Sequence, residues 1–257
     1  MEYIIIPLVA LLASGLTLFS GFGLGTLLLP VFSIFYPIEI AIALTAVVHF
    51  LNNIFKLILF AKFSDKNSIL LFGLPAILGA FLGAELLSLL SGIKPLTQYR
   101  FYDSVYNIEI VKLIISVLIF VFVMAEFSKR FEKLSFNKKY LTMGGILSGF
   151  FGGLSGHQGA LRSAFLVKLN LSKESFIGTG VVIACLIDLT RLSVYSSKIF
   201  QTELKQNMTL LVISVLAAFA GAYIGNKILK KITYQSVKII VAVMLIIISI
   251  GLASGMI

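Results

Sequence analysis

Charged residues are scarce in this chain of 257 amino acids. Lys, Arg, Asp and Glu together make up 12% of it, whereas hydrophobic residues make up 59% and the mean hydropathy is +1.05. A soluble domain carries about 25% charged residues, so this chain has too few to cover its own surface in water. The composition therefore excludes a soluble globular protein. It predicts an all-α polytopic membrane helix bundle, because apolar stretches of about 20 residues can each cross a bilayer.

Cysteine and tryptophan are also in short supply. The single cysteine, Cys185, cannot form an internal disulfide and is expected to be a small packed residue within an apolar run. Because tryptophan is absent, the interfacial aromatic belt must consist of the nine tyrosines and of phenylalanine. No basic segment precedes the first apolar stretch at Tyr3, so no cleavable secretory signal is expected.

The net charge of +10 comes from cations that lie between the apolar stretches. In a soluble protein such an excess would suggest nucleic acid. In a membrane protein it is typical of cytoplasmic loops, which are rich in Lys and Arg. The lipid bilayer, and not nucleic acid, is therefore the expected partner.

One pattern occurs twice in the chain. Residues 20–60 align with residues 155–195 without a gap, at a constant offset of 135. The matched positions include Asn53 with Asp188, Lys56 with Arg191, Glu39 with Glu174, and, at a slightly larger offset, Gly79–Gly83 with Gly221–Gly225. A duplicated apolar unit interrupted by glycines is how many secondary transporters are built. We predict two pseudo-equivalent halves: a first transmembrane repeat (1–126), a cytoplasmic linker (127–139) and a second transmembrane repeat (140–257).

The first apolar stretch of each half is too long for a single crossing. As one helix, the uncharged run from Tyr3 to Ile38 would be about 50 Å long against a hydrocarbon core of about 30 Å. Glycine clusters interrupt both stretches, at 21–25 and 152–159. We expect a glycine-broken first helix in each half: either two half-helices that enter and leave on the same side, or one span followed by a tilted extension.

The charge distribution favours hairpins of two half-helices. With them, thirteen loop Lys and Arg residues lie on one side of the membrane and five on the other, whereas eight single crossings divide them nine to nine. The positive-inside bias therefore favours three crossings in each half, which makes the halves inverted repeats and leaves both termini outside the cytoplasm.

The second glycine cluster carries the most informative polar residues. A broken backbone leaves N–H groups free, a half-helix presents its positive end, and Arg162 adds a guanidinium within two turns. These groups suit a small oxyanion such as sulfite, a sulfonate or a carboxylate. The alternative is that Arg162 snorkels to a headgroup and that the glycines only allow close packing. The predicted substrate-binding residues are Gly21, Gly23, Gly25, Thr26, Ser155, Gly156, His157, Gln158, Gly159 and Arg162.

Ionisable residues in the helices that follow are costly in hydrocarbon and are candidates for function. Asn53 and Lys56 stand three residues apart, as do Asp188 and Arg191, so each pair shares one helix face. The pairs form either a coupling or gating site along the pathway or a salt-bridged helix end. The predicted coupling or gating residues are His49, Asn53, Lys56, Asp188 and Arg191. Proton coupling through His157 or Asp188 is a hypothesis.

The chain resembles the TauE/SafE sulfite-exporter-like family, also called the toluene sulfonate uptake permease family. The resemblance covers nearly the whole chain and rests on two glycine-rich segments, Gly15–Pro30 and Gly145–Arg162. It implies a multi-pass transporter of sulfur-containing or related small anions in the cell (inner) membrane of a bacterium or archaeon. The chain departs from the family's glycine-dense second motif by placing His157, Gln158 and Arg162 there.

The predicted function is transport of a small anion by alternating access, without enzyme activity, cofactor or metal. Two alternatives stay open. Gly153–Gly156 fits the G-x-S-G pattern of intramembrane serine proteases, with Ser155 as nucleophile and His49 as the base. A passive anion channel on the same scaffold is the other. The sequence does not decide the anion, the direction of transport, the coupling ion or whether copies form a homo-oligomer.

Overall fold

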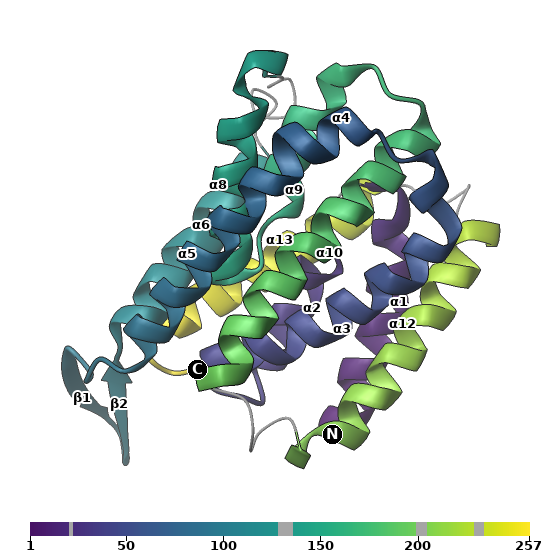
Figure 1. Cartoon of the computed structure of the whole chain (residues 1–257). Helices are drawn as coiled ribbons and strands as arrows, with labels where there is room; N and C mark the ends of the chain where they lie inside the picture. Colours follow the sequence, from purple (N-terminus) through teal and green to yellow (C-terminus); the bar gives the residue numbers. More distant parts are fainter. Residues whose placement is uncertain (21–22, 128–135, 199–204, 229–233) are drawn as a thin grey trace.

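The computed structural model describes residues 1–20, 23–127, 136–198, 205–228 and 234–257, and these parts are almost wholly helical (Figure 1). The first half contains α1 (Glu2–Ser20), α2 (Leu24–Ser33), α3 (Ile38–Phe60), α4 (Lys66–Ser68), α5 (Leu74–Ser91) and α6 (Ile110–Phe127). The second half contains α8 (Leu141–Ser155), α9 (Gly159–Leu166), α10 (Lys173–Lys198), α12 (Met208–Ile228) and α13 (Tyr234–Ala253). Short 3₁₀ turns extend α3 (Ala61–Phe63), precede α8 (Lys138–Tyr140) and follow α9 (Val167–Leu169), and a π-helical turn (Ile69–Gly73) joins α4 to α5.

Four helical segments of the described chain are long and apolar enough to cross a membrane: Ile38–Phe63, Lys66–Ser91, Lys173–Ser196 and Met208–Gly225. Four shorter apolar helices accompany them: Glu2–Thr17, Leu24–Ser33, Ile110–Ala125 and Ala242–Ala253. Large apolar side chains such as Ile58 and Ile247 stay exposed on the outer surface, at 79% and 61%. An outer surface of this kind suits a bilayer, where apolar side chains face lipid. The prediction of a polytopic membrane helix bundle is confirmed.

Both long apolar stretches are interrupted at their glycine clusters. α1 ends at Ser20, and α2 begins after Gly23, which has an extended backbone. α8 ends at Gly156, whose φ of +81° is a left-handed conformation that strongly favours glycine. The two interruptions meet in the bundle, because a Cβ placed on Gly25 would lie only 3.7 Å from the carbonyl oxygen of Gly156.

The two halves contact each other through two closely packed helix pairs, each with one helix from each half. α8 packs along α5, and α1 packs along α12. A Cβ on Gly79 of α5 would lie 2.1 Å from the carbonyl oxygen of Ile146, and one on Gly221 of α12 would lie 2.0 Å from that of Leu11. Helices in a bilayer gain little from hydrophobic burial against each other, so residues that allow backbones to approach supply the packing energy. The Gly-x-x-x-Gly pattern seen in the sequence therefore forms the main seams between the halves.

α3 and α10 cross in the centre of the bundle and run antiparallel (Figure 1). The end of α3 at Phe60 meets the start of α10, since a Cβ on Gly178 would lie 2.3 Å from the Phe60 carbonyl oxygen. α6 and α13 also run antiparallel; one of their contacts is a hydrogen bond from the Ser249 hydroxyl to the Ser116 carbonyl at 2.8 Å. The α3–α10 crossing brings together the polar residues of both halves.

A β-hairpin joins α5 to α6, in a segment that the sequence analysis treats only as polar. Strands β1 (Thr97–Phe101) and β2 (Ser104–Ile108) pair antiparallel, with Thr97 opposite Ile108. The hairpin packs on the C-terminal end of the chain, where the Tyr99 hydroxyl donates to the Ser254 carbonyl at 2.6 Å. Both chain termini lie toward the same end of the bundle as this hairpin (Figure 1).

Candidate functional site

Five polar residues of α3 and α10 gather where these helices cross. His49, Asn53 and Lys56 lie on one face of α3, because they follow each other at intervals of four and three residues. Asp188 and Arg191 lie on the facing side of α10, also three residues apart. None of the five is more than 5% exposed. The predicted coupling or gating residues therefore come together in space.

Asp188 is the hub of this cluster. Its Oδ2 lies 2.5 Å from His49 Nδ1, and its Oδ1 accepts from Gln158 Nε2 at 3.0 Å and from Arg191 Nε at 3.0 Å. The Nη2 of Arg191 also lies 2.7 Å from Oδ1. Burying a charge is costly unless it is paired and hydrogen-bonded; here both carboxylate oxygens are hydrogen-bonded, and the guanidinium is paired with the carboxylate through Nε and Nη2. Asp188 thus connects α3, the interruption between α8 and α9, and α10.

Gln158 extends the network from Asp188 to Arg162. Its side chain donates to Asp188 with Nε2 and accepts from Arg162 Nη1 with Oε1 at 3.1 Å. Its own carbonyl accepts from the Ser148 hydroxyl at 3.0 Å, which fixes the interrupted backbone against α8. Arg162 is only 7% exposed, so it does not snorkel to a headgroup. The guanidinium is held inside the bundle, one turn along α9.

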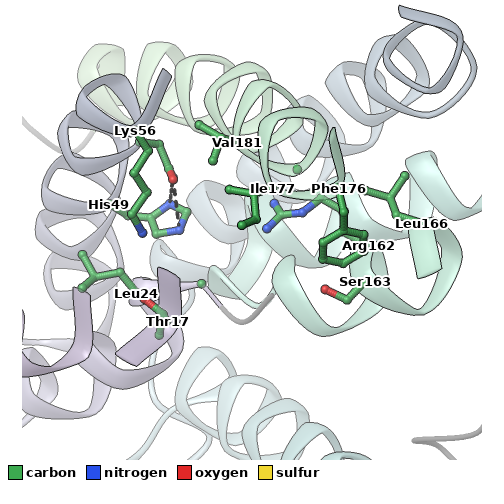
Figure 2. A pocket seen from close by; sticks show the side chains of 13 residues that line it. Thr17, Leu24, His49, Lys56, Arg162, Ser163, Leu166, Phe176, Ile177 and Val181 are labelled. Atoms are coloured by element: carbon green, nitrogen blue, oxygen red, sulfur yellow. Dashed lines mark hydrogen bonds between the residues drawn. The ribbon is translucent and has the colours of Figure 1, made fainter. Parts of the chain in front are cut away.

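A cavity of about 40 Å³ lies beside this network (Figure 2). Its polar wall includes His49, Asn53 and Lys56 from α3 and Arg162 from α9, and Gly23 contributes backbone from the first interruption. Figure 2 shows Lys56 and Arg162 entering from opposite sides. The volume is enough for a few water molecules or one small oxyanion. No carboxylate is among the described residues that line it.

Several predicted binding residues lie near the cavity without lining it. Gly25 packs against Thr45 of α3, and Thr26 sits in the first turn of α2, where its backbone N–H donates to the Gly23 carbonyl. Gly156 adjoins Arg191, since a Cβ there would lie 3.2 Å from Nη1. Gln158, Asp188 and Arg191 do not line the cavity but form the hydrogen-bond network that holds Arg162 and His49, and Gly159 is the first residue of α9. Gly21 lies outside the described residues.

Ser155 and His157 do not line the cavity. The Ser155 hydroxyl donates to the Phe151 carbonyl at 3.1 Å, and His157 Nδ1 lies 3.1 Å from both oxygens of Ser155. The His157 ring stacks on Phe122 of α6, and its Nε2 has no hydrogen-bond partner within the described chain. Among the described residues no hydrogen bond joins Ser155 to His49, which the protease alternative requires as the base. The predicted substrate-binding set is therefore divided between the cavity and this second location.

Much of the cavity wall consists of residues that the sequence does not single out. The missed residues are Thr17, Leu24, Ser163, Leu166, Phe176, Ile177, Gly180 and Val181. Most of them are apolar, and an apolar residue in a membrane chain gives no signal that sets it apart from lipid-facing neighbours. Gly180 adjoins the guanidinium of Arg162, since a Cβ there would lie 3.4 Å from its Nε, at van der Waals contact.

Within the residues that the structure describes, no group of three or more His, Cys, Asp or Glu side chains could hold a metal ion. The cavity wall supplies hydrogen-bond donors and positive charge, from Lys56, Arg162 and the neighbouring polar side chains. Such groups bind and orient an anion.

An apolar outer surface, two interrupted helices that meet at mid-bundle and a buried cavity with cationic walls define a multi-pass membrane protein of the transporter class. Residues 6–252 match the family model described as Sulfite exporter TauE/SafE, and the chain belongs to this family. Its members are membrane transporters of sulfur-containing anions and not enzymes, which confirms the predictions of family and of a non-enzyme. No curated protein and no solved structure matches the chain.

Proposed function

We propose that the protein moves a small sulfur-containing anion, sulfite or a small sulfonate, across the membrane by alternating access, and that the anion binds in the central cavity. The observation that carries this proposal is a cavity beside the buried Arg162 with no carboxylate among its described lining residues. A guanidinium held in place by Gln158 offers its remaining N–H donors as a fork that matches a planar face of an oxyanion. A volume of about 40 Å³ suits sulfite better than an aromatic sulfonate.

Inverted repeats are part of the proposed mechanism. Two pairs of helices that occupy equivalent places in the halves, α3 with α10 and α6 with α13, run antiparallel to each other. The contacts between halves are also reciprocal, because α5 packs on α8 as α12 packs on α1. Antiparallel equivalents and reciprocal contacts are expected from a pseudo-two-fold axis in the membrane plane. They support the division into repeats 1–126 and 140–257, joined by the linker 127–139 on the cytoplasmic side of a bacterial or archaeal cell membrane.

In this mechanism the anion sits where the two interruptions meet, and the halves rock around it. The glycine seams between α5 and α8 and between α1 and α12 are the contacts across which one half slides against the other. Proton coupling is assigned to Asp188 with its partner His49, or to His157, whose ring is buried. Transport that is unaffected when the proton gradient is collapsed would exclude such coupling.

Binding is tested by thermal unfolding of the purified protein with sulfite, thiosulfate, sulfoacetate, taurine, sulfate or acetate. A ligand that binds only the folded state adds about 2.7 kcal/mol of stability at 100 times its Kd. We expect at least one sulfur anion to stabilise the protein and Arg162→Ala to abolish the effect. Lys168→Ala, which removes an exposed cation two residues beyond the end of α9, is the matched control and should respond like the wild type. An equal response in Arg162→Ala would reject this site.

A further inference from the structure

The two halves place a basic residue at the same position but give it different partners. Lys56 follows Asn53 by three residues in α3, and Arg191 follows Asp188 by three residues in α10, at the matched positions of the repeat. Arg191 is paired with the Asp188 carboxylate through Nε and Nη2. Lys56 has only a neutral amide at the corresponding place. The duplication is therefore asymmetric in charge.

Lys56 carries a buried charge that nothing in the described chain compensates. It is 5% exposed, and within the described residues its ammonium makes no hydrogen bond or ion pair. It faces the cavity that Arg162 enters from the other side (Figure 2). A buried ammonium without a partner is costly, and two cations facing one cavity also repel each other. A cavity of this kind is stabilised when an anion supplies the missing charge.

Asn53 explains why the lysine stays unpaired. Its Nδ2 lies 3.1 Å from His49 Nδ1 and 3.5 Å from Asp188 Oδ2. A carboxylate at position 53 would therefore stand beside the Asp188 carboxylate, and like charges at such a distance in a buried site disfavour each other. Two ionised aspartates at the two matched positions would therefore destabilise each other. The half with Asp188 neutralises its own cation, and the half with Asn53 leaves Lys56 available to a ligand.

We propose that Lys56 and Arg162 bind the anion together, and that their two charges make the cavity selective for dianions over monoanions of the same shape. This inference rests on the proposed function, because it assumes that the cavity is the anion site. It moves Lys56 from a coupling role to a binding role. A dianion neutralises both cations. A monoanion leaves one of them buried and unpaired, so its binding free energy is less favourable by the cost of one uncompensated buried charge.

Sulfate and methanesulfonate provide a matched pair of probes. Both are tetrahedral with five heavy atoms, and they differ by one oxygen against one methyl group and hence by one negative charge. Binding to the purified full-length protein is measured by calorimetry at one pH and ionic strength. We expect the wild type to bind sulfate at least about tenfold more tightly than methanesulfonate, because charge pairs desolvated in a binding site contribute strongly to affinity.

Lys56→Gln should remove this selectivity. Sulfate affinity should fall at least about tenfold, while methanesulfonate affinity should change less than about threefold. Lys56→Arg retains the charge and should retain the preference for sulfate. Lys62→Gln removes an exposed cation six residues further along and should bind both probes as the wild type does.

Lys56→Gln can also be tested by thermal unfolding in the absence of any anion. Because Lys56 is buried without a partner, Lys56→Gln should unfold at the same temperature as the wild type or at a higher one. A lower unfolding temperature, or failure to fold, would show that the ammonium has a structural partner and would overturn the proposal. A wild type that binds both probes equally, or a Lys56→Gln protein that still prefers sulfate, would overturn it while leaving anion transport intact. A wild type that binds no anion at all would reject the proposed function itself.

Discussion

Replacing Asp188 by asparagine tests the account of the central network. The substitution keeps the shape of the side chain but removes the one carboxylate that faces His49, Gln158 and Arg191. The Arg191 side chain is fully buried, and its contacts outside Asp188 are with neutral groups, among them a 3.3 Å hydrogen bond from Nη1 to the Gly152 carbonyl and a hydrogen bond with the Tyr195 side chain. Arg191 would then be a buried cation without a counter-charge.

Breaking a buried ion pair by removing one partner costs about 3–5 kcal/mol. Since whole proteins are stable by only about 5–15 kcal/mol, Asp188→Asn should lose a large share of the total. Arg191→Met should be destabilising as well, because it leaves the carboxylate with fewer donors. The double variant should lose less than the sum of the two single losses, because it removes both charges.

The assay is equilibrium unfolding of the four proteins in mixed micelles with increasing SDS. A double-mutant cycle then gives the coupling free energy between positions 188 and 191, which we expect to be at least about 1 kcal/mol. A loss smaller than about 1 kcal/mol in Asp188→Asn, or single losses that simply add, would refute the reasoning that the carboxylate compensates a buried guanidinium.

Two further predictions concern glycines whose geometry the structure specifies. Gly156→Ala should lower the unfolding free energy by about 1–2 kcal/mol, because a left-handed φ of +81° is strained for alanine. A variant that unfolds at the wild-type temperature would contradict this. Gly79→Ala should weaken the α5–α8 seam and lower the unfolding temperature, because its Cβ would meet the Ile146 carbonyl oxygen at 2.1 Å. Gly92→Ala, whose Cβ would meet nothing closer than 3.7 Å, is the matched control and should unfold like the wild type.

The helix bundle and its interruptions could be predicted because their causes are local. A run without charge from Tyr3 to Ile38 cannot be one ordinary span, and a glycine cluster in its middle is where a backbone can change direction. The same argument places the second interruption near Gly156. Composition and periodicity carry this information without any knowledge of the tertiary fold.

The pairing of distant residues could not be predicted in this way. His49 and Asp188 are 139 positions apart, and only the crossing of α3 with α10 brings them within 2.5 Å. The sequence analysis considers Asp188 with Arg191, which share a helix face, but has no local signal for His49 or Gln158 as further partners. Apolar cavity residues such as Ile177 are missed because their environment depends on helix orientation.

The β-hairpin is missed for a different reason. Residues 97–101 alternate between aromatic or β-branched and polar side chains, which is typical of a strand, but residues 104–108 do not alternate strictly, and the turn at Tyr102 has neither glycine nor asparagine. Tyr102 instead adopts a φ of 53°, which is uncommon for an aromatic residue. Contact of the hairpin with the C-terminal end, through Tyr99 and Ser254, helps to hold this conformation.

Sulfite entry into proteoliposomes is the most direct measurement of the central claim that the cavity at Arg162 carries a sulfur anion. Wild type, Arg162→Ala and the exposed-cation control Lys168→Ala are reconstituted at equal density, and initial rates are compared with those of protein-free liposomes. We predict that the wild type and Lys168→Ala transport sulfite at equal rates and that Arg162→Ala falls to the rate of protein-free liposomes. Transport by Arg162→Ala at the wild-type rate would contradict the account.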